Sequence, residues 1–266
     1  MTVRREARLA DNRFETGLFA PRPQPASAAR MLFAQSRLEL KLLLRNGEQL
    51  LLTMFIPITL LIGLTLLPFG ELGDDRVARV VPAVMMVAIM STEFTGQAIA
   101  VGFDRRYGAL KRLGATPLPR WGIIGGKSVA VVIVVIMQSV LLGSIGVALG
   151  WRPSPAGLLL GAVVIALGTV TFASMGLLLG GTLRAEIVLA LANVAWFVML
   201  GIGSAVFVDD QIPQGLQIVA RIVPSGALGE ALNRGVASSF DLFGIAVLLV
   251  WAAVCGTLAV RTFKFT

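Results

Sequence analysis

The sequence predicts an all-α integral membrane protein with six transmembrane helices. Of its 266 residues 56% are hydrophobic and only 14% are charged, whereas soluble domains contain about 25% charged residues. A helix crosses a bilayer with about twenty mostly apolar residues. Six such stretches follow one another, at roughly 50–69, 80–103, 128–150, 157–181, 187–208 and 241–260. This leaves too little polar sequence for a separate soluble domain.

The segment before the first apolar stretch has two parts. Residues 1–27 are rich in charge and proline and lack the apolar region of a signal peptide, so we expect a disordered cytosolic tail. Residues 28–46 look helical, and a basic stripe with leucines on both sides runs along them: Arg30, Arg37, Lys41 and Arg45. Such a helix suits the interface with anionic lipid. Packing on another protein chain fits it equally well. The transmembrane domain would then cover residues 28–266.

The distribution of positive charge predicts the orientation, because cytosolic loops carry an excess of Lys and Arg. Eighteen of the 23 basic residues fall in the N-terminal segment, in the loop after the second span, at Arg184 and at the C-terminus. Five fall in the opposite loops. We therefore expect both termini in the cytosol. An excess of Arg over Lys is typical of a GC-rich bacterial genome, which favours a bacterial plasma membrane.

The loops add two expectations. The net charge of +8 would also fit a nucleic-acid-binding protein, but the membrane-like composition assigns this charge to the cytosolic face and anionic lipid. The region 209–240 contains Pro213 and Pro224 and is too interrupted to span. We expect short helices there, on the outer face before the last span.

Four polar residues interrupt the predicted spans: Glu93, Gln97, Gln138 and Asn193. An acid near the bilayer centre costs about 2.5–3.5 kcal/mol on insertion scales, so Glu93 must face protein or a water-filled cavity. One interpretation is that these residues line a substrate path, with Glu93 as a possible proton site. The other is that they only join helices by hydrogen bonds.

Several Gly-x-x-x-Gly pairs allow helices to approach closely. They occur at Gly146 and Gly150, at Gly157 and Gly161, and at Gly176 and Gly180. We expect them to serve packing within the chain more than contact between subunits.

The sequence does not predict a catalytic or metal site. It contains no His, and its single Cys255 lies in an apolar stretch, so a thiolate metal site and a disulfide are both excluded. Gly122–Ser128 resembles a phosphate-binding loop, whose spacing is Gly-x-x-x-x-Gly-Lys-Ser. Trp121 stands where this spacing requires the first glycine, so the motif is absent. No cofactor is expected on this chain, and an enzyme acting within the membrane is the least favoured class.

The basic loop between the second and third spans carries the most specific pattern. Tyr107–Leu113 predicts two helical turns that end at Thr116-Pro-Leu-Pro. Apolar Ala109, Leu110 and Leu113 stand among basic residues, as in a short docking helix and unlike a solvated connector.

This loop resembles that of the ABC-2 type permeases, especially their drug-export group, which includes the daunorubicin-resistance permeases. The family pattern is an acid, then Gly-Thr-Leu-Glu-x-Leu-x-Ala-Thr-Pro-Leu-x-Arg, then Gly-Lys and a span. The residues that match it are Asp104, Gly108, Leu110, Leu113, Ala115, Thr116, Pro117, Leu118, Arg120, Gly126 and Lys127. Two positions depart from the pattern: Ala109 replaces Thr and Lys111 replaces Glu. The resemblance covers about 30–266.

The resemblance implies a permease subunit that exports an amphiphilic drug-like or lipid-like substrate, as in antibiotic efflux. A second permease, identical or paralogous, would pair with it, and two copies of a separate ATPase would bind ATP and Mg²⁺. The docking residues would be Asp104, Gly108, Leu110, Lys111, Leu113, Ala115, Thr116 and Pro117. The alternatives are a secondary transporter or channel without an ATPase, and a membrane assembly or immunity factor that transports nothing.

Overall fold

The computed structural model describes residues 26–67, 75–116, 118–204, 207 and 214–264. The described residues form helices and no strands, which confirms the all-α prediction. The helices are α2 (Ala28–Arg45), α3 (Gly47–Leu66), α4 (Arg76–Ile89), η1 (Met90–Gly96), α5 (Gln97–Arg106), α6 (Ala109–Gly114), α7 (Arg120–Ala148), α8 (Pro155–Thr182), α9 (Ala185–Ser204), α10 (Gln214–Ile222), α11 (Pro224–Val236) and α12 (Leu242–Thr262). The predicted N-terminal tail and Pro117 lie outside the described residues, except for residues 26 and 27 of the tail.

Five helical segments in the described part are long and apolar enough to cross a membrane: Arg76–Arg106, Trp121–Ala148, Pro155–Thr182, Ala185–Ser204 and Leu242–Thr262. They correspond to the second to sixth predicted spans. The apolar part of α3, Thr53–Leu66, is shorter. The chain is therefore a multi-pass membrane protein.

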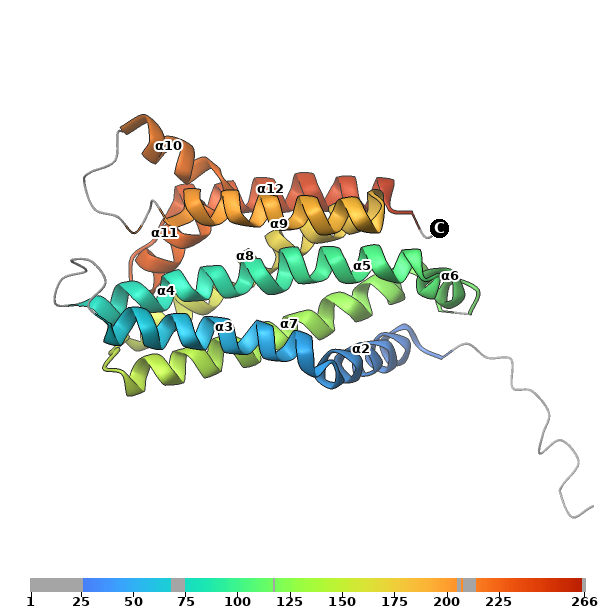
Figure 1. Cartoon of the computed structure of the whole chain (residues 1–266), viewed down its shortest axis with the longest axis horizontal. Coiled ribbons are helices and arrows are strands. Elements are labelled where there is room, and N and C mark those ends of the chain that lie inside the picture. The colour runs from blue at the N-terminus through green and yellow to red at the C-terminus, as the bar shows by residue number, and fades with distance from the viewer. Residues whose placement is uncertain (1–25, 68–74, 117, 205–206, 208–213, 265–266) are drawn as a thin grey trace, which may run out of the picture.

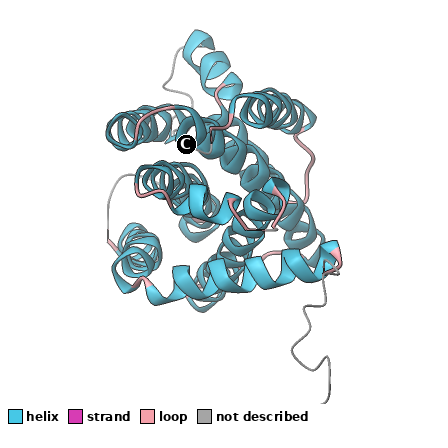
Figure 2. Ribbon diagram, turned by 90° about the vertical axis from the view of Figure 1, so that its right-hand side faces the viewer, coloured by secondary structure: helices cyan, strands magenta, loops and turns pink. Residues whose placement is uncertain are grey.

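The spans run roughly side by side along the long axis of the molecule (Figure 1). Helices α2 and α6 and the C-terminus lie at one end, and α10 and α11 lie at the other. Figure 2 looks along the bundle from the end that carries α2 and α6. In the part of the chain that the structure describes, the segments that the charge count assigned to the cytosol therefore share one end.

Helix α8 lies at the centre of the bundle and packs mainly against α12, α5, η1 and α11. Its glycines make these contacts close. A Cβ at Gly176 would lie 2.6 Å from the Glu93 carbonyl oxygen, and one at Gly180 would lie against the Ala98 carbonyl oxygen. Gly157 and Gly161 face Val236 of α11 in the same way. These pairs serve packing within the chain, as expected.

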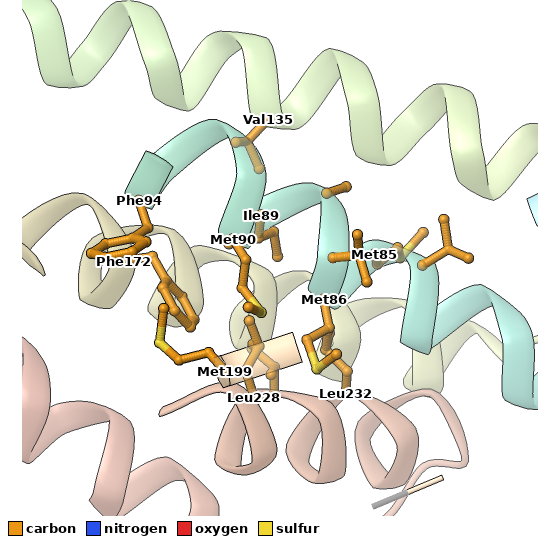
Figure 3. Packing of buried hydrophobic residues seen from close by; sticks show 14 of the residues in the cluster. Met85, Met86, Ile89, Met90, Phe94, Val135, Phe172, Met199, Leu228 and Leu232 are labelled. Atoms are coloured by element: carbon orange, nitrogen blue, oxygen red, sulfur yellow. The ribbon is translucent and has the colours of Figure 1, made fainter. Parts of the chain in front are cut away.

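Methionine and aromatic side chains fill the core between α4, η1, α8, α9 and α11 (Figure 3). Met90 points toward Leu228 and Met86 toward Leu232 of α11, while Phe94 and Phe172 lie next to each other. Phe172 and Met90 are fully buried. The flexible thioether of Met fills irregular gaps between helices that cross at different angles.

The turn from α7 to α8 is closed by local chemistry. Gly150 has a φ of +107°, a conformation that favours glycine. The Trp151 N–H donates to the Gly146 carbonyl at 2.8 Å, and the Gly150 N–H donates to the Val147 carbonyl at 3.1 Å. This is the Schellman pattern of a helix C-terminus. Ser154 then caps α8 by accepting a hydrogen bond from the Gly157 N–H, with Pro155 in the first turn.

The region before the last span forms two helices, α10 and α11, as the sequence predicted. Helix α11 is largely buried, whereas Ile218, Val219 and Ile222 of α10 are exposed. Arg221 pairs with buried Asp241 at 2.7 Å, which ties α10 to the start of α12.

We predict that Gly176→Val destabilises the protein, because the added side chain meets the carbonyl oxygens of Glu93 and Phe94 and overpacking costs about 1–3 kcal/mol. The melting temperature of the purified protein, followed by fluorescence-detected size exclusion, should fall. Gly201→Val is the matched control, since a Cβ at Gly201 meets nothing within 4 Å. Equal melting temperatures for the two variants would contradict the packing role of Gly176.

Candidate functional site

The loop that the sequence singled out forms a short helix fixed to the end of the spans. Gly108, with a φ of +69°, makes the turn from α5 into α6. Leu110 of α6 is 1% exposed and packs with Val101 of α5 and Ile123 of α7. Leu113 and Leu118 are partly buried against the same cluster. These contacts anchor α6 to α5 and α7.

The burial of Leu110 changes the interpretation of the loop. The sequence pattern predicted that Leu110 contacts the ATPase. Its side chain instead faces the bundle and anchors α6 to the spans. The solvent-facing side of α6 carries exposed Lys111 and Arg112, and Tyr107, in the turn before α6, is 68% exposed. Ala115 and Thr116 are also exposed. The exposed surface of α6 and of the turn before it is thus basic and aromatic, and the apolar side of α6 is covered by the spans.

Immediately behind α6, one buried lysine joins three helices. The Lys127 Nζ of α7 lies 2.6 Å from Asp104 Oδ2 of α5 and 2.9 Å from Glu39 Oε2 of α2. Glu39 Oε1 also accepts a hydrogen bond from Gln35 Nε2 at 2.8 Å. The Lys127 and Glu39 side chains are only 14% and 8% exposed. We call Glu39, Asp104 and Lys127 the ionic node.

Helix α2 reaches the ionic node because glycine precedes Lys127. A Cβ at Gly126 would overlap the Gln35 side chain, so only glycine lets α2 lie this close to α7. The buried face of α2 is polar, with Gln35, Ser36 and Glu39. Its predicted basic stripe points outward, and all four residues of that stripe, Arg30, Arg37, Lys41 and Arg45, are exposed.

Sequence reasoning missed two members of this region. Glu39 was part of the predicted interfacial helix but had no assigned role, although an acid opposite a basic stripe signals a buried partner. Arg105 was counted only as a positive charge. Its Nη1 donates to the carbonyls of Gly180 and Leu183 at 2.9 and 3.0 Å. A cation is favourable at these terminal carbonyls because of the helix dipole, so Arg105 ties α5 to the end of α8.

The four polar residues of the spans do not form one cluster. Gln138 Nε2 donates to the Thr53 carbonyl of α3 at 2.7 Å, and Thr92 Oγ1 donates to Gln138 Oε1 at 3.2 Å. Gln138 therefore joins α3, η1 and α7. Asn193 on α9 is exposed, and its Nδ2 donates to the Leu189 carbonyl within its own helix.

Glu93 is fully buried in η1, a π-helical turn inside a continuous helix from Arg76 to Arg106. Neither of its carboxyl oxygens has a hydrogen-bond partner among the described residues, and the same holds for both amide atoms of Gln97. A π-turn within an α-helix frequently marks a functional position. Gln97 borders a small internal cavity of about 50 Å³ that extends to Glu39 and Lys127.

A larger groove of about 540 Å³ lies between α3, the η1–α5 segment and α9. Its wall combines ring and polar side chains: Asn46, Thr53, Ser91, Thr95, Phe103, Asn193, Trp196 and Phe197. Trp196 Nε1 donates to Ser91 Oγ at 3.1 Å, and the Trp196 and Phe197 rings meet edge to face at 5.0 Å. Of the four predicted path residues, only Asn193 borders this groove.

The fold describes a helical membrane protein with a short helix, α6, at one end of its spans, and comparison with known families agrees with that class. Residues 31–236 match the family described as ABC-2 type transporter. This match covers more than half of the chain, so the chain belongs to the ABC-2 type transporter family. It is the permease component of an ABC transporter, and family membership implies an ABC ATPase as its partner. A search of curated proteins finds no match.

We predict that Lys127→Met destabilises the protein by about 3–5 kcal/mol, the usual cost of leaving a buried charge unpaired. The variant keeps Glu39 and Asp104 but removes the cation between them. The thermal midpoint of the purified protein measures this loss. The triple variant Glu39→Gln, Asp104→Asn, Lys127→Met removes all three charges and should recover part of it. A single variant as stable as the wild type would mean that the ionic node contributes nothing.

Proposed function

We propose that this permease works in an ATP-driven exporter and moves an amphiphilic, drug-like or lipid-like substrate out of the cytosol or inner leaflet. The observation that carries the proposal is the groove between α3, the η1–α5 segment and α9. Its volume falls within the roughly 300–1,000 Å³ that is typical of small-molecule sites. Its mixture of aromatic rings, hydroxyls and two amides suits a molecule with both apolar and polar parts.

The groove is open on one side in the single chain, which supports pairing with a second permease, identical or paralogous. Phe197 is 66% exposed at its edge, and Phe55 and Ile56 of α3 are 60% and 46% exposed nearby in the chain. A partner that covers these side chains would close the groove into a path between two subunits. In this arrangement α3 also crosses the membrane, as the first of six spans.

The exposed face of α6 is the proposed contact with the ATPase. Lys111 and Arg112 project from α6, whose other side is fixed by Leu110, and exposed Tyr107 lies in the turn before it. A basic surface of this kind fits an acidic surface on the partner, and Lys111 contributes a positive charge where relatives carry Glu. ATP and Mg²⁺ would bind to that partner, in two copies, and not to this chain.

The ionic node is a physical connection through which the ATPase contact at α6 could act on the groove. Asp104 lies in the last turn of α5, just before α6, and Lys127 of α7 immediately precedes the third predicted span. A displacement of α6 therefore acts on α5, on α7 and, through Glu39, on α2. Helices α5 and η1 also form one wall of the groove, so the same displacement changes its shape.

The proposal places the α2, α6 and C-terminal end in the cytosol of a bacterial plasma membrane. The charge count supports this orientation through the excess of Lys and Arg at that end. The drug-export group is the proposed subgroup, because its pattern matches the α6 loop at most positions. An antibiotic-efflux role follows from that resemblance.

We predict that the double variant Lys111→Glu, Arg112→Glu reduces copurification of the ATPase by at least tenfold while the permease stays in the membrane. Such a loss corresponds to about 1.4 kcal/mol of binding free energy. Affinity capture from the source membrane, with quantitative mass spectrometry of the bound chains, measures it. The double variant Arg152→Glu, Arg234→Glu makes the same charge change on exposed residues at the other end of the bundle. Docking at α6 is wrong if both double variants retain the same amount of ATPase.

A second prediction concerns the groove. Phe197→Ala and Asn193→Leu each alter its wall without touching the core, so cells that express either variant with the ATPase should export fluorescent daunorubicin at least fivefold more slowly. Phe240→Ala is the matched control, because Phe240 is also 66% exposed but does not line the groove. Unchanged export in both groove variants, at equal membrane abundance, would exclude this groove as the path for that substrate.

A further inference from the structure

A second groove lies between α7 and α8, apart from the proposed substrate path. Its volume is about 490 Å³, and its wall is mostly apolar. Helices α7 and α8 diverge here because α8 packs mainly on α12, α5 and α11. Met85 of α4 and Trp151, each 5% exposed, are the most buried hydrophobic residues of this groove, while Val140 and Leu158 are 64% and 50% exposed at its sides. The two grooves share no lining residue.

The α7–α8 groove has the length of a lipid chain. From Ser139 to Val147 it follows α7 for eight residues, which at 1.5 Å per residue is about 12 Å. The hydrocarbon part of one leaflet is about 15 Å thick, half of the bilayer core. The groove therefore extends through most of one leaflet, namely the one that meets the end of the bundle opposite α2 and α6.

At that end the groove meets a polar chamber of about 570 Å³. Trp151 and Val236 line both the groove and the chamber, so the two adjoin. Among the described residues, two cations, Arg79 and Arg152, and one acid, Asp75, line the chamber, and these three side chains have a net charge of +1. Its remaining polar groups include the Asn233 amide.

The turn between α7 and α8 holds this mouth in place. The Schellman closure at Gly150 brings Trp151 back over the last turn of α7, where it borders the groove. Arg152 Nη1 then donates to the carbonyls of Val147 and Trp151 at 2.8 and 3.1 Å. These bonds fix the exposed guanidinium at the boundary between the apolar groove and the polar chamber.

We propose that the α7–α8 groove binds an anionic glycerophospholipid, with one acyl chain along α7 and the phosphate beside Arg79 and Arg152. Guanidinium groups bind phosphate through paired charge-assisted hydrogen bonds. An apolar groove of one-leaflet length that opens on two cations matches both parts of such a lipid. The lipid completes the packing between α7 and α8. The proposal depends on the membrane location of the chain and not on its proposed transport activity.

Native mass spectrometry of the purified full-length protein, titrated with dioleoylphosphatidylglycerol, tests the site. The wild type should retain this lipid at least tenfold more strongly than dioleoylphosphatidylcholine. Gly143→Leu should abolish the retention, because a Cβ at Gly143 lies 3.7 Å from Met85 Cε and 3.9 Å from Trp151 Cζ3, and a longer side chain fills the groove. Arg152→Gln should remove the preference for the anionic lipid.

Gly256→Leu is the matched control, since Gly256 of α12 has similar clearance, 3.5 Å to Ser174 Oγ, but lies outside the groove. It should retain the lipid like the wild type. Equal retention by Gly143→Leu and wild type overturns the site. Loss of a dimer mass from Gly143→Leu with unchanged lipid retention also overturns it, in favour of a subunit contact on this face.

A second measurement does not depend on altering the groove. With Trp121, Trp196 and Trp251 replaced by Phe, Trp151 is the one remaining tryptophan. Brominated phosphatidylglycerol in phosphatidylcholine bilayers should quench Trp151 at low mole fraction and with saturation, as a bound lipid does. Quenching that rises only in proportion to the total brominated lipid, or that is the same for brominated phosphatidylcholine, contradicts the proposal.

Discussion

The end of the molecule that carries α6 depends on one buried cation. Lys127 is held by Glu39 from α2 and Asp104 from α5, so three segments far apart in the chain share a single ionic contact. Leaving Lys127 or Glu39 unpaired is costly, because their side chains are only 14% and 8% exposed. The contact therefore fixes the relative placement of the N-terminal helix, the second predicted span and the third. The short helix α6 rests on the same two spans through Leu110, and its position is set by them.

Close helix packing imposes a second constraint. Helix α8 brings glycines against the backbone of η1 and α5, and this approach leaves Glu93 enclosed without a described partner for its carboxyl oxygens. The π-helical turn at Met90–Gly96 lies within this contact. A substitution on α8 therefore acts on the wall of the groove between α3, the η1–α5 segment and α9, although α8 itself does not line that groove.

The single chain has two grooves of similar size and different chemistry. One combines aromatic rings with hydroxyl and amide groups between α3, α5 and α9, which suits a molecule that binds and leaves. The other is apolar with a cationic mouth between α7 and α8, which suits a lipid that stays. Both exist because α8 draws α5, α11 and α12 together and leaves α3 and α7 at the edge of the bundle.

The sequence alone determined the class of the protein. Its composition and apolar stretches predicted the membrane helices, Tyr107–Leu113 predicted α6, and the charge count placed α2, α6 and the C-terminus at one end. Only the tertiary structure decided where individual side chains point. Leu110 faces inward, Gln97 and Asn193 border different cavities, and Lys127 pairs with an acid 88 residues away. Helical periodicity defines the faces of a helix, but the neighbour that covers each face is set by packing between segments distant in sequence. For that reason local pattern predicts the helices and not their contacts.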